Sequence, residues 1–293
     1  MAEGSWDMGT GSIGIVIPVY NTDGAYIDEC IASALAQTVE CRVVVVDDGS
    51  THPGTLESLA RWAAQGVEVV RHPENRGTSV ALDSGAGALD TDYIMPVGSD
   101  DRIRPSLCAE VAAVLDDDPA AGVVSTDLRF FGSHDRIDRL PPTDSVADIL
   151  FGNTIPGASA FRRSDWIALG GFATGLKFGQ DWEFWVRLLA TGRTARIVHQ
   201  PLYEYRRHAA QVTARMTEEG KLEHSLDVVR RNTGIWGDHV EEIMRRYWTL
   251  KDEHTRQAAR LEVLERRYGA LNRMLGRGAR LLRSLRPGRK RAG

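Results

Sequence analysis

The sequence has few cysteines and no long apolar run, and each shortage excludes a class of protein. Cys30, Cys41 and Cys108 are scattered without a Cys-x-x-Cys pair, which argues against a disulfide framework or a zinc site and favours the reducing cytosol. No apolar run reaches the length of about 18 residues that a membrane span needs. Residues 1–12 lack the basic and apolar segments of a secretory signal, so we expect a flexible N-terminus.

The composition is otherwise ordinary for a globular protein, with 42% hydrophobic and 26% charged residues in a chain of 293. Its net charge of −4 is unevenly distributed. Residues 273–293 carry eight basic residues and no acidic one, which leaves 28 basic against 40 acidic residues, or −12, elsewhere. A polyanionic partner would therefore meet the tail, because the body of the protein is acidic.

The first hundred residues alternate β-branched runs with helical segments. Strands are expected at 13–18, 43–46, 67–71 and 93–97, and helices at 25–36, 53–65 and 77–89. This alternation is typical of βαβ units, so the sequence predicts an α/β, Rossmann-like fold with a mostly parallel sheet flanked by helices. In such sheets ligands bind outside the carboxyl ends of the strands.

Polar side chains follow each of these strands: Tyr20 and Asn21, Asp47 and Asp48, His72 to Arg76, and Asp100 and Asp101. Adjacent carboxylates such as Asp100 and Asp101 repel each other and resist burial, so a cation or a sugar hydroxyl would suit them. A solvated turn that caps the next helix is the alternative. Four strands that deliver polar groups to one edge favour a binding site.

The second half of the chain is less regular. Helices are expected at 105–117, 164–169 and 181–190, strands at 122–131, 154–162, 195–198 and 202–206, and a polar loop at 132–145. From Val240 onward apolar residues recur at alternating three- and four-residue steps, which predicts a long amphipathic helix. Its basic end at 271–286 suits an anionic membrane surface, with a dimerising coiled coil or a frayed tail as alternatives. Nucleic-acid binding is not expected, because no aromatic residue interleaves the final basic cluster.

Five motifs occur in order: Ile-Val-Ile-Pro-Val-Tyr-Asn (15–21), Val-Val-Val-Asp-Asp-Gly-Ser-Thr (44–51), Asn-x-Gly (75–77), Ser-Asp-Asp (99–101) and Gly-Gln-Asp-Trp-Glu-x-Trp-x-Arg-Leu (179–188). Each is weak alone, but their order and spacing over about residues 13–210 resemble family 2 glycosyltransferases of the GT-A fold. With the helical period, the resemblance implies a GT-A domain at 13–215 and a C-terminal α-helical extension at 216–293 that ends in the basic amphipathic tail.

The resemblance implies inverting transfer from a UDP- or dTDP-linked sugar to an acceptor hydroxyl, in cell-envelope or surface-polysaccharide biosynthesis, assisted by Mn²⁺ or Mg²⁺. Carried over by position, the residues that would bind the nucleotide sugar are Pro18, Val19, Tyr20, Asn21, Asp48, Arg76, Gly77, Ser99 and Asp100. Asp101 would ligate the metal, and His208 is a further candidate, with a surface histidine as the alternative. Ser99 replaces the first acid of the family's Asp-x-Asp, but Mg²⁺ often needs only one or two carboxylates beside phosphate oxygens.

Asp181 matches the family's general base, and a carboxylate that takes the acceptor's proton speeds the displacement. A helix-capping role is the alternative for Asp181. Trp182 and Glu183 are candidate acceptor contacts, and specificity for donor sugar and acceptor is expected from 132–145 and 154–178.

Two departures from the family pattern bear on function. Ala81-Leu82-Asp83 stands where members often carry Ala-Arg-Asn, and the Gln-x-x-Arg-Trp motif of processive synthases is absent. We therefore expect a cytoplasmic enzyme, peripheral on the inner face of the membrane if its tail binds there, that adds one or a few sugars to a carbohydrate or lipid-linked acceptor. A homo-oligomer through the C-terminal helix is compatible with this.

Two other functions stay open. A sugar-1-phosphate nucleotidylyltransferase would need a glycine-rich phosphate loop after the first strand, and Pro18–Asn21 is not one. A non-catalytic sugar-binding or scaffold protein is disfavoured by the intact Asp48, Asp101 and Asp181.

Overall fold

The computed structural model describes residues 11–133, 135–208 and 217–284, and the side chains of these residues up to 264. The chain forms two compact units, Met1–Asp238 and His239–Gly293, which are considered separately. The strands are β1 (Ile13–Val19), β2 (Cys41–Asp47), β3 (Glu68–Arg71), β4 (Tyr93–Pro96), β5 (Arg102–Ile103), β6 (Ala121–Gly132), β7 (Arg136–Asp138), β8 (Ala160–Arg162) and β9 (Thr194–Arg207). The helices are α1 (Gly24–Leu35), α2 (Pro53–Ala64), α3 (Thr78–Ala88), α4 (Leu107–Asp117), η1 (Val146–Ile149), α5 (Arg163–Leu169), α6 (Gln180–Ala190), α7 (Glu218–Arg231), α8 (Thr233–Asp238) and α9 (Val240–Ser284).

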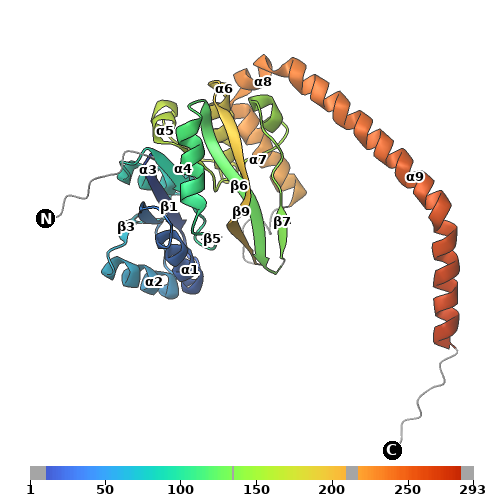
Figure 1. Ribbon diagram of the computed structural model, residues 1–293, viewed down its shortest axis with the longest axis horizontal. Helices are drawn as coiled ribbons and strands as arrows, with labels where there is room; N and C mark the ends of the chain where they lie inside the picture. The colour runs from blue at the N-terminus through green and yellow to red at the C-terminus, as the bar shows by residue number, and fades with distance from the viewer. Residues whose placement is uncertain (1–10, 134, 209–216, 285–293) are drawn as a thin grey trace, which may run out of the picture. The chain divides into compact units, whose positions relative to one another are not determined.

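The first unit is built on one sheet, whose described strands follow the order β3-β2-β1-β4-β8-β6-β9-β5, with β7 beside β6. The segment β3-β2-β1-β4 is parallel, as the βαβ alternation predicts. β8 is antiparallel to both β4 and β6, β9 is parallel to β6, and β5 is antiparallel to β9. The long β6–β9 pair runs side by side through the middle of the unit (Figure 1).

Helices cover both faces of the parallel segment because the side chains of β1 alternate between them. Ile13, Ile15 and Ile17 of β1 belong to a buried core that also contains residues of α1 and α4. On the other face α3 approaches closely, since a Cβ on Gly85 would lie only 2.3 Å from Cγ1 of Val16. The small residues of α3 therefore allow the close helix–sheet packing that positions the start of this helix.

Three expectations for the second half were wrong in detail. Only Ala160–Arg162 of the expected strand 154–162 is a strand, and the expected loop 132–145 contains β7. The two late strands are one, β9, in which residues 199–202 bulge between the pairs Thr126–Val198 and Leu128–Tyr203. A polar and proline-containing bulge looks like a strand break in the sequence, but pairing with β6 continues on both sides.

The helices α7 and α8 pack within the first unit and not within the extension. Val228 of α7 is fully buried, and Asn232 donates to the Glu183 carboxylate of α6. The Trp236 ring lies 6.3 Å from that of Trp182, measured between centroids. The first unit therefore extends to Asp238, whereas we expected the GT-A domain to end at 215.

The second unit contains α9, a single helix of 45 residues, as the apolar period predicts. Its described side chains include exposed Val240, Met244, Trp248, Leu261 and Val263. The basic amphipathic pattern of 271–293 and the N-terminal residues 1–10 lie outside the residues whose side chains are described. No helix of the described chain is both long and apolar enough to cross a membrane.

Candidate active site

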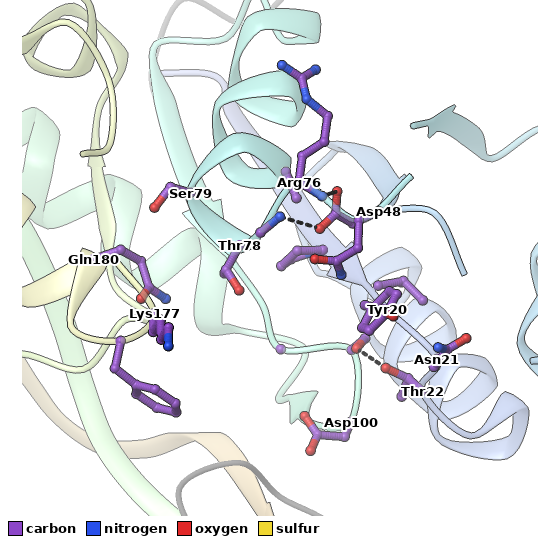
Figure 2. A pocket seen from close by; sticks show the side chains of 18 of the residues that line it. Tyr20, Asn21, Thr22, Asp48, Arg76, Thr78, Ser79, Asp100, Lys177 and Gln180 are labelled. Atoms are coloured by element: carbon purple, nitrogen blue, oxygen red, sulfur yellow. Dashed lines mark hydrogen bonds between the residues drawn. The ribbon is translucent and has the colours of Figure 1, made fainter. Parts of the chain in front are cut away.

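A cavity of about 1070 Å³ opens where β1, β2 and β4 end (Figure 2). All nine residues predicted to bind the nucleotide sugar line it: Pro18, Val19, Tyr20, Asn21, Asp48, Arg76, Gly77, Ser99 and Asp100. His208, which follows β9, lines it as well. The tertiary structure therefore brings residues from five separate parts of the chain to one edge of the sheet.

Asp48 is held rigidly at the end of β2. Its Oδ1 atom accepts a 2.9 Å hydrogen bond from the Arg76 amide and lies 2.7 Å from Nδ1 of His72, while Oδ2 accepts from the Gly77 amide at 2.8 Å. Figure 2 shows the carboxylate turned toward the loop that begins α3. A buried carboxylate with three partners keeps a fixed direction, which suits recognition of one ligand N–H group. The contact with His72 was not foreseen from the sequence.

Asn21 and Tyr20 form the wall beside Asp48. Asn21 adopts a left-handed backbone (φ 51°), and its Oδ1 accepts from the amides of Thr51 and His52. The Asn21 side chain thereby fixes the loop that follows β2. Tyr20 is 51% exposed, so its ring is available to a planar ligand.

The turn after β4 separates the two adjacent carboxylates. Asp100 lines the cavity, and its Oδ2 atom lies 2.8 Å from Nε2 of His208. Asp101 is 3% exposed and does not line the cavity; its oxygens accept from the Tyr203 hydroxyl at 2.6 Å and the Arg206 amide at 2.8 Å. Burial, and secondarily the charge of Asp100, raise the pKa of Asp101 to about 8. From the sequence we expected Asp101 to ligate the metal, but Asp100 and not Asp101 lines the cavity.

Asp100 and His208 bring together a carboxylate and an imidazole, two side-chain groups that ligate divalent cations. Their facing atoms are 2.8 Å apart, close to the separation of neighbouring ligands around an ion with metal–oxygen distances of about 2.1 Å. The described residues contain no cluster of three or more His, Cys, Asp or Glu side chains that could hold an ion. Phosphate oxygens and water would therefore have to complete the coordination, which is common for Mg²⁺.

Asp181 lies in the first turn of α6, next to Gln180, which lines the cavity. Gly179 is the N-cap residue of α6, so Asp181 is not its cap. The Oδ2 atom of Asp181 accepts a 2.9 Å hydrogen bond from Nδ2 of Asn153. Burial raises the pKa of the Asp181 carboxyl, although this hydrogen bond opposes the shift. A carboxylate with a raised pKa is a better proton acceptor than an ordinary aspartate.

Trp182 and Glu183 are directed into the interior. Nε1 of Trp182 donates to the Ile149 carbonyl at 2.7 Å, and Glu183 forms a two-point ion pair with Arg187 at 2.8 Å. Both side chains are buried, and neither lines the cavity. The structure thus corrects the expectation that they contact an acceptor: they hold α6 against its neighbours.

The sequence analysis did not identify Lys177, a positively charged side chain at the site. Among the described residues that line the cavity, the lysine and arginine members are Arg76 and Lys177. Figure 2 shows the Arg76 side chain extending away from Tyr20 and Asp100, and Lys177 standing beside Gln180. Lys177 lies between Gly175 (φ 77°) and Gly179 (φ 75°), and this glycine pair just before Asp181 is the signal that could have drawn attention to it.

Comparison with known proteins gives a family match. The model of the family described as glycosyl transferase family 2 matches residues 14–170. The putative glycosyltransferase EpsH of Bacillus subtilis is 27% identical over 224 residues, which cover 71% of this chain and 64% of the relative. The succinoglycan biosynthesis protein ExoU of Rhizobium meliloti is 29% identical over 196 residues, covering 59% and 56%. Two further relatives are longer, and the match spans only 22% and 31% of their length.

Solved structures share the fold. S. aureus TarS 1–349 in complex with UDP-GlcNAc superimposes with a TM-score of 0.62 at 18% identity, over 75% of this chain and 64% of that one. The mannosyltransferase PcManGT from Pyrobaculum calidifontis, in complex with GDP-Man and Mn²⁺, gives a TM-score of 0.52 at 22% identity, over 68% and 59%. At these identities the likeness establishes the architecture alone.

Proposed function

The chain belongs to glycosyltransferase family 2 and is an enzyme of that class with the GT-A fold, and we propose that it transfers a sugar, with inversion, from a nucleoside-diphosphate sugar to an acceptor hydroxyl. One observation carries the proposal. Residues from the ends of β1, β2 and β4 and from the end of β9 converge on one cavity, with Asp181 beside its edge. The family match also leaves no support for the nucleotidylyltransferase alternative.

The nucleoside binds against Tyr20 and Asp48 in this proposal. The exposed Tyr20 ring stacks on the base, and the fixed Asp48 carboxylate accepts the ring N–H that uracil and thymine both offer. That pairing suits a UDP- or dTDP-linked donor. The TarS complex with UDP-GlcNAc, a protein of the same fold, is compatible with UDP.

The diphosphate lies at Asp100 and His208, which we propose as ligands of Mg²⁺ or Mn²⁺ in place of Asp101. When bound, such a cation neutralises the charge that develops on the departing phosphate. Lys177 adds a positive charge to the same cavity. Asp101 holds the turn that presents Asp100, through Tyr203 and Arg206.

Asp181 acts as the general base. Its carboxylate removes the proton of the acceptor hydroxyl as the acceptor oxygen attacks the anomeric carbon and the diphosphate leaves from the other side. One displacement of this kind inverts the anomeric configuration. Asn153 orients Asp181 through the 2.9 Å hydrogen bond, and burial raises the pKa of the carboxyl toward the range in which it accepts a proton readily.

The biological setting is the assembly of surface polysaccharide. Relatives with names of this kind, such as ExoU, support it, as does the family match. We further propose that the enzyme works in the cytoplasm, on a carbohydrate or lipid-linked acceptor, and that α9 and its basic tail bring it to an anionic membrane surface or to a second copy of the chain.

The test is nucleotide release. Purified protein is incubated with UDP-glucose, UDP-galactose, UDP-N-acetylglucosamine, a dTDP-sugar and GDP-mannose, with Mn²⁺, with Mg²⁺ or with EDTA. We expect slow release of UDP or dTDP from one donor, stimulated by the metal and faster with an acceptor. If the protein neither binds nor cleaves any of these donors, the proposed function is excluded.

A further inference from the structure

A second cavity, of about 620 Å³, lies between β6, β7, β9 and the segment 153–158. We call it the β6–β7 cavity. Its lining includes Leu128 of β6, Ile137 of β7, Asn153, Gly157 and Tyr205 of β9. Its volume falls in the range of roughly 300–1,000 Å³ that is typical of small-molecule sites.

The β6–β7 cavity adjoins the site of chemistry. Tyr205 lines both cavities. Asn153, which lines the second cavity, donates to Asp181, whose neighbour Gln180 lines the first. Asp181 is therefore in contact with the wall of the β6–β7 cavity and adjacent to the donor cavity.

Gly157 lies directly against the Asp181 carboxylate. A Cβ at this position would lie 3.1 Å from Oδ2 and 3.3 Å from Cβ of Asp181. The glycine thus brings the backbone of the second cavity against the carboxylate without a side chain between them. The carboxylate in contact with Asn153 and Gly157 of this lining is that of Asp181.

The lining combines apolar surface with polar groups and balanced charge. Ile137 is 62% exposed, and Leu128, Pro141 and Tyr205 add apolar or aromatic surface. Asn153 and Thr154 offer hydrogen bonds, and the two charged lining residues, Asp138 and Arg139, are of opposite sign. Apolar faces interrupted by a few polar groups match a sugar ring, which presents C–H faces and a rim of hydroxyls.

We propose that the β6–β7 cavity is the acceptor site and that its ligand is a neutral saccharide. This rests on the proposed function. The acceptor hydroxyl reaches Asp181 past Asn153 and Gly157, its oxygen forms the bond to the anomeric carbon, and its proton passes to the Asp181 carboxylate. The bond from the anomeric carbon to the phosphate oxygen breaks, and the nucleoside diphosphate keeps the electron pair.

A lipid chain fits the lining less well than a saccharide does. An acyl or prenyl chain gains its affinity from continuous apolar surface. Asp138, Arg139, Asn153 and Thr154 interrupt that surface in the β6–β7 cavity.

The experiment compares Ile137→Arg with Ile167→Arg in the full chain. Both isoleucines are exposed, 62% and 55%, so both variants are expected to fold, but Ile167 is on α5 and lines neither cavity. With the donor found above, p-nitrophenyl glycosides serve as acceptors, and farnesyl phosphate serves as the lipid probe. We expect Ile137→Arg to raise the acceptor KM about tenfold or more, and to raise it more than the donor KM, because the arginine occupies the cavity. Ile167→Arg should change neither KM.

Binding is read without turnover by saturation-transfer NMR of the same aryl glycoside on Asp181→Asn, with and without Ile137→Arg. Loss of the signal in the double variant supports the assignment. Equal acceptor KM values for Ile137→Arg and wild type would overturn it, as would transfer to farnesyl phosphate and to no glycoside. A wild-type chain that releases no nucleotide from any donor would refute the proposed function itself.

Discussion

Nε2 of His208 lies 2.8 Å from Oδ2 of Asp100, although 108 residues of sequence separate them. The contact forms because β9 runs beside β6 and also pairs with β5, which follows Asp100 and Asp101 directly. The same arrangement brings Tyr203 and the Arg206 amide onto Asp101. Two adjacent aspartates thus acquire different environments, one in the cavity and one in the interior.

We predict that Asp100→Asn and His208→Ala weaken Mn²⁺-dependent UDP binding by about tenfold or more, because each removes a proposed metal ligand. Asp101→Asn is the matched control and should retain binding, since an amide can still bond to Tyr203 and to the Arg206 amide. Isothermal titration calorimetry measures the UDP affinity of wild type and of each variant in Mn²⁺ and in EDTA. If Asp101→Asn weakens Mn²⁺-dependent UDP binding more than Asp100→Asn does, Asp101 and not Asp100 is the metal ligand.

A pH dependence of stability follows from Asp101. Its pKa is raised from 3.8 to about 8, so the folded protein binds the proton more tightly than the unfolded chain does. The stability contributed by this group is complete below pH 3.8 and is lost as the pH rises toward 8. Measured in EDTA by urea unfolding, the free energy of unfolding of wild type relative to Asp101→Asn should decline across that window and be constant outside it. A difference that does not vary with pH would contradict the raised pKa.

Asp181→Asn should keep UDP binding and lower transfer by about 10²- to 10⁴-fold, the usual contribution of a general base. In wild type the rate should rise with pH through the raised pKa of Asp181 and then level off, because only the ionised form accepts a proton. Asn153→Ala removes a hydrogen bond that lowers the pKa, so the rising limb should move to higher pH. The pH profile of kcat measures this shift. A limb that stays in place in Asn153→Ala would speak against Asp181 as the titrating base.

Lys177→Ala should weaken UDP binding roughly tenfold, the size expected for one hydrogen bond to a charged group, and should affect UMP much less. The reason is that UMP lacks the second phosphate, which we place nearest Lys177 and the Asp100–His208 pair. Arg76→Ala is the control, because that side chain extends away from Asp100. Fluorescence or calorimetric titration gives the Kd values of UMP and UDP for wild type and both variants. Equal losses for UMP and UDP would remove Lys177 from the phosphate site.

Leu261→Glu combined with Leu264→Glu tests the role of α9. Both leucines are exposed in the single chain and share one stripe of the helix. If α9 pairs with a second copy, light scattering should show a dimer in wild type and a monomer in the double variant. Co-sedimentation with anionic vesicles, measured in parallel, should be unchanged by the variant if the basic tail carries membrane binding. If the wild type is monomeric and does not bind anionic vesicles, both proposed partners of α9 are excluded.

Much of the fold could be predicted from the sequence because it depends on local patterns. Each β-branched run of the first hundred residues is a strand at or near the expected place. Since parallel strands end at one edge, the polar residues that follow them had to lie together, and all nine predicted nucleotide-sugar residues line one cavity. Periodicity likewise predicted α9.

Tertiary contacts decided what local patterns do not encode. Whether Asp100 or Asp101 faces the cavity depends on Tyr203 and Arg206. These residues lie on a strand about a hundred residues away and donate hydrogen bonds to Asp101. Trp182 and Glu183 resemble exposed ligand contacts in the motif, yet Ile149 and Arg187 hold them inside. The β6–β7 cavity forms only when distant segments of the chain come together. Local sequence specifies which residues stand at strand ends, because backbone propensity and hydrophobic period are local properties. The direction of each side chain depends on packing, because its partners come from distant parts of the chain.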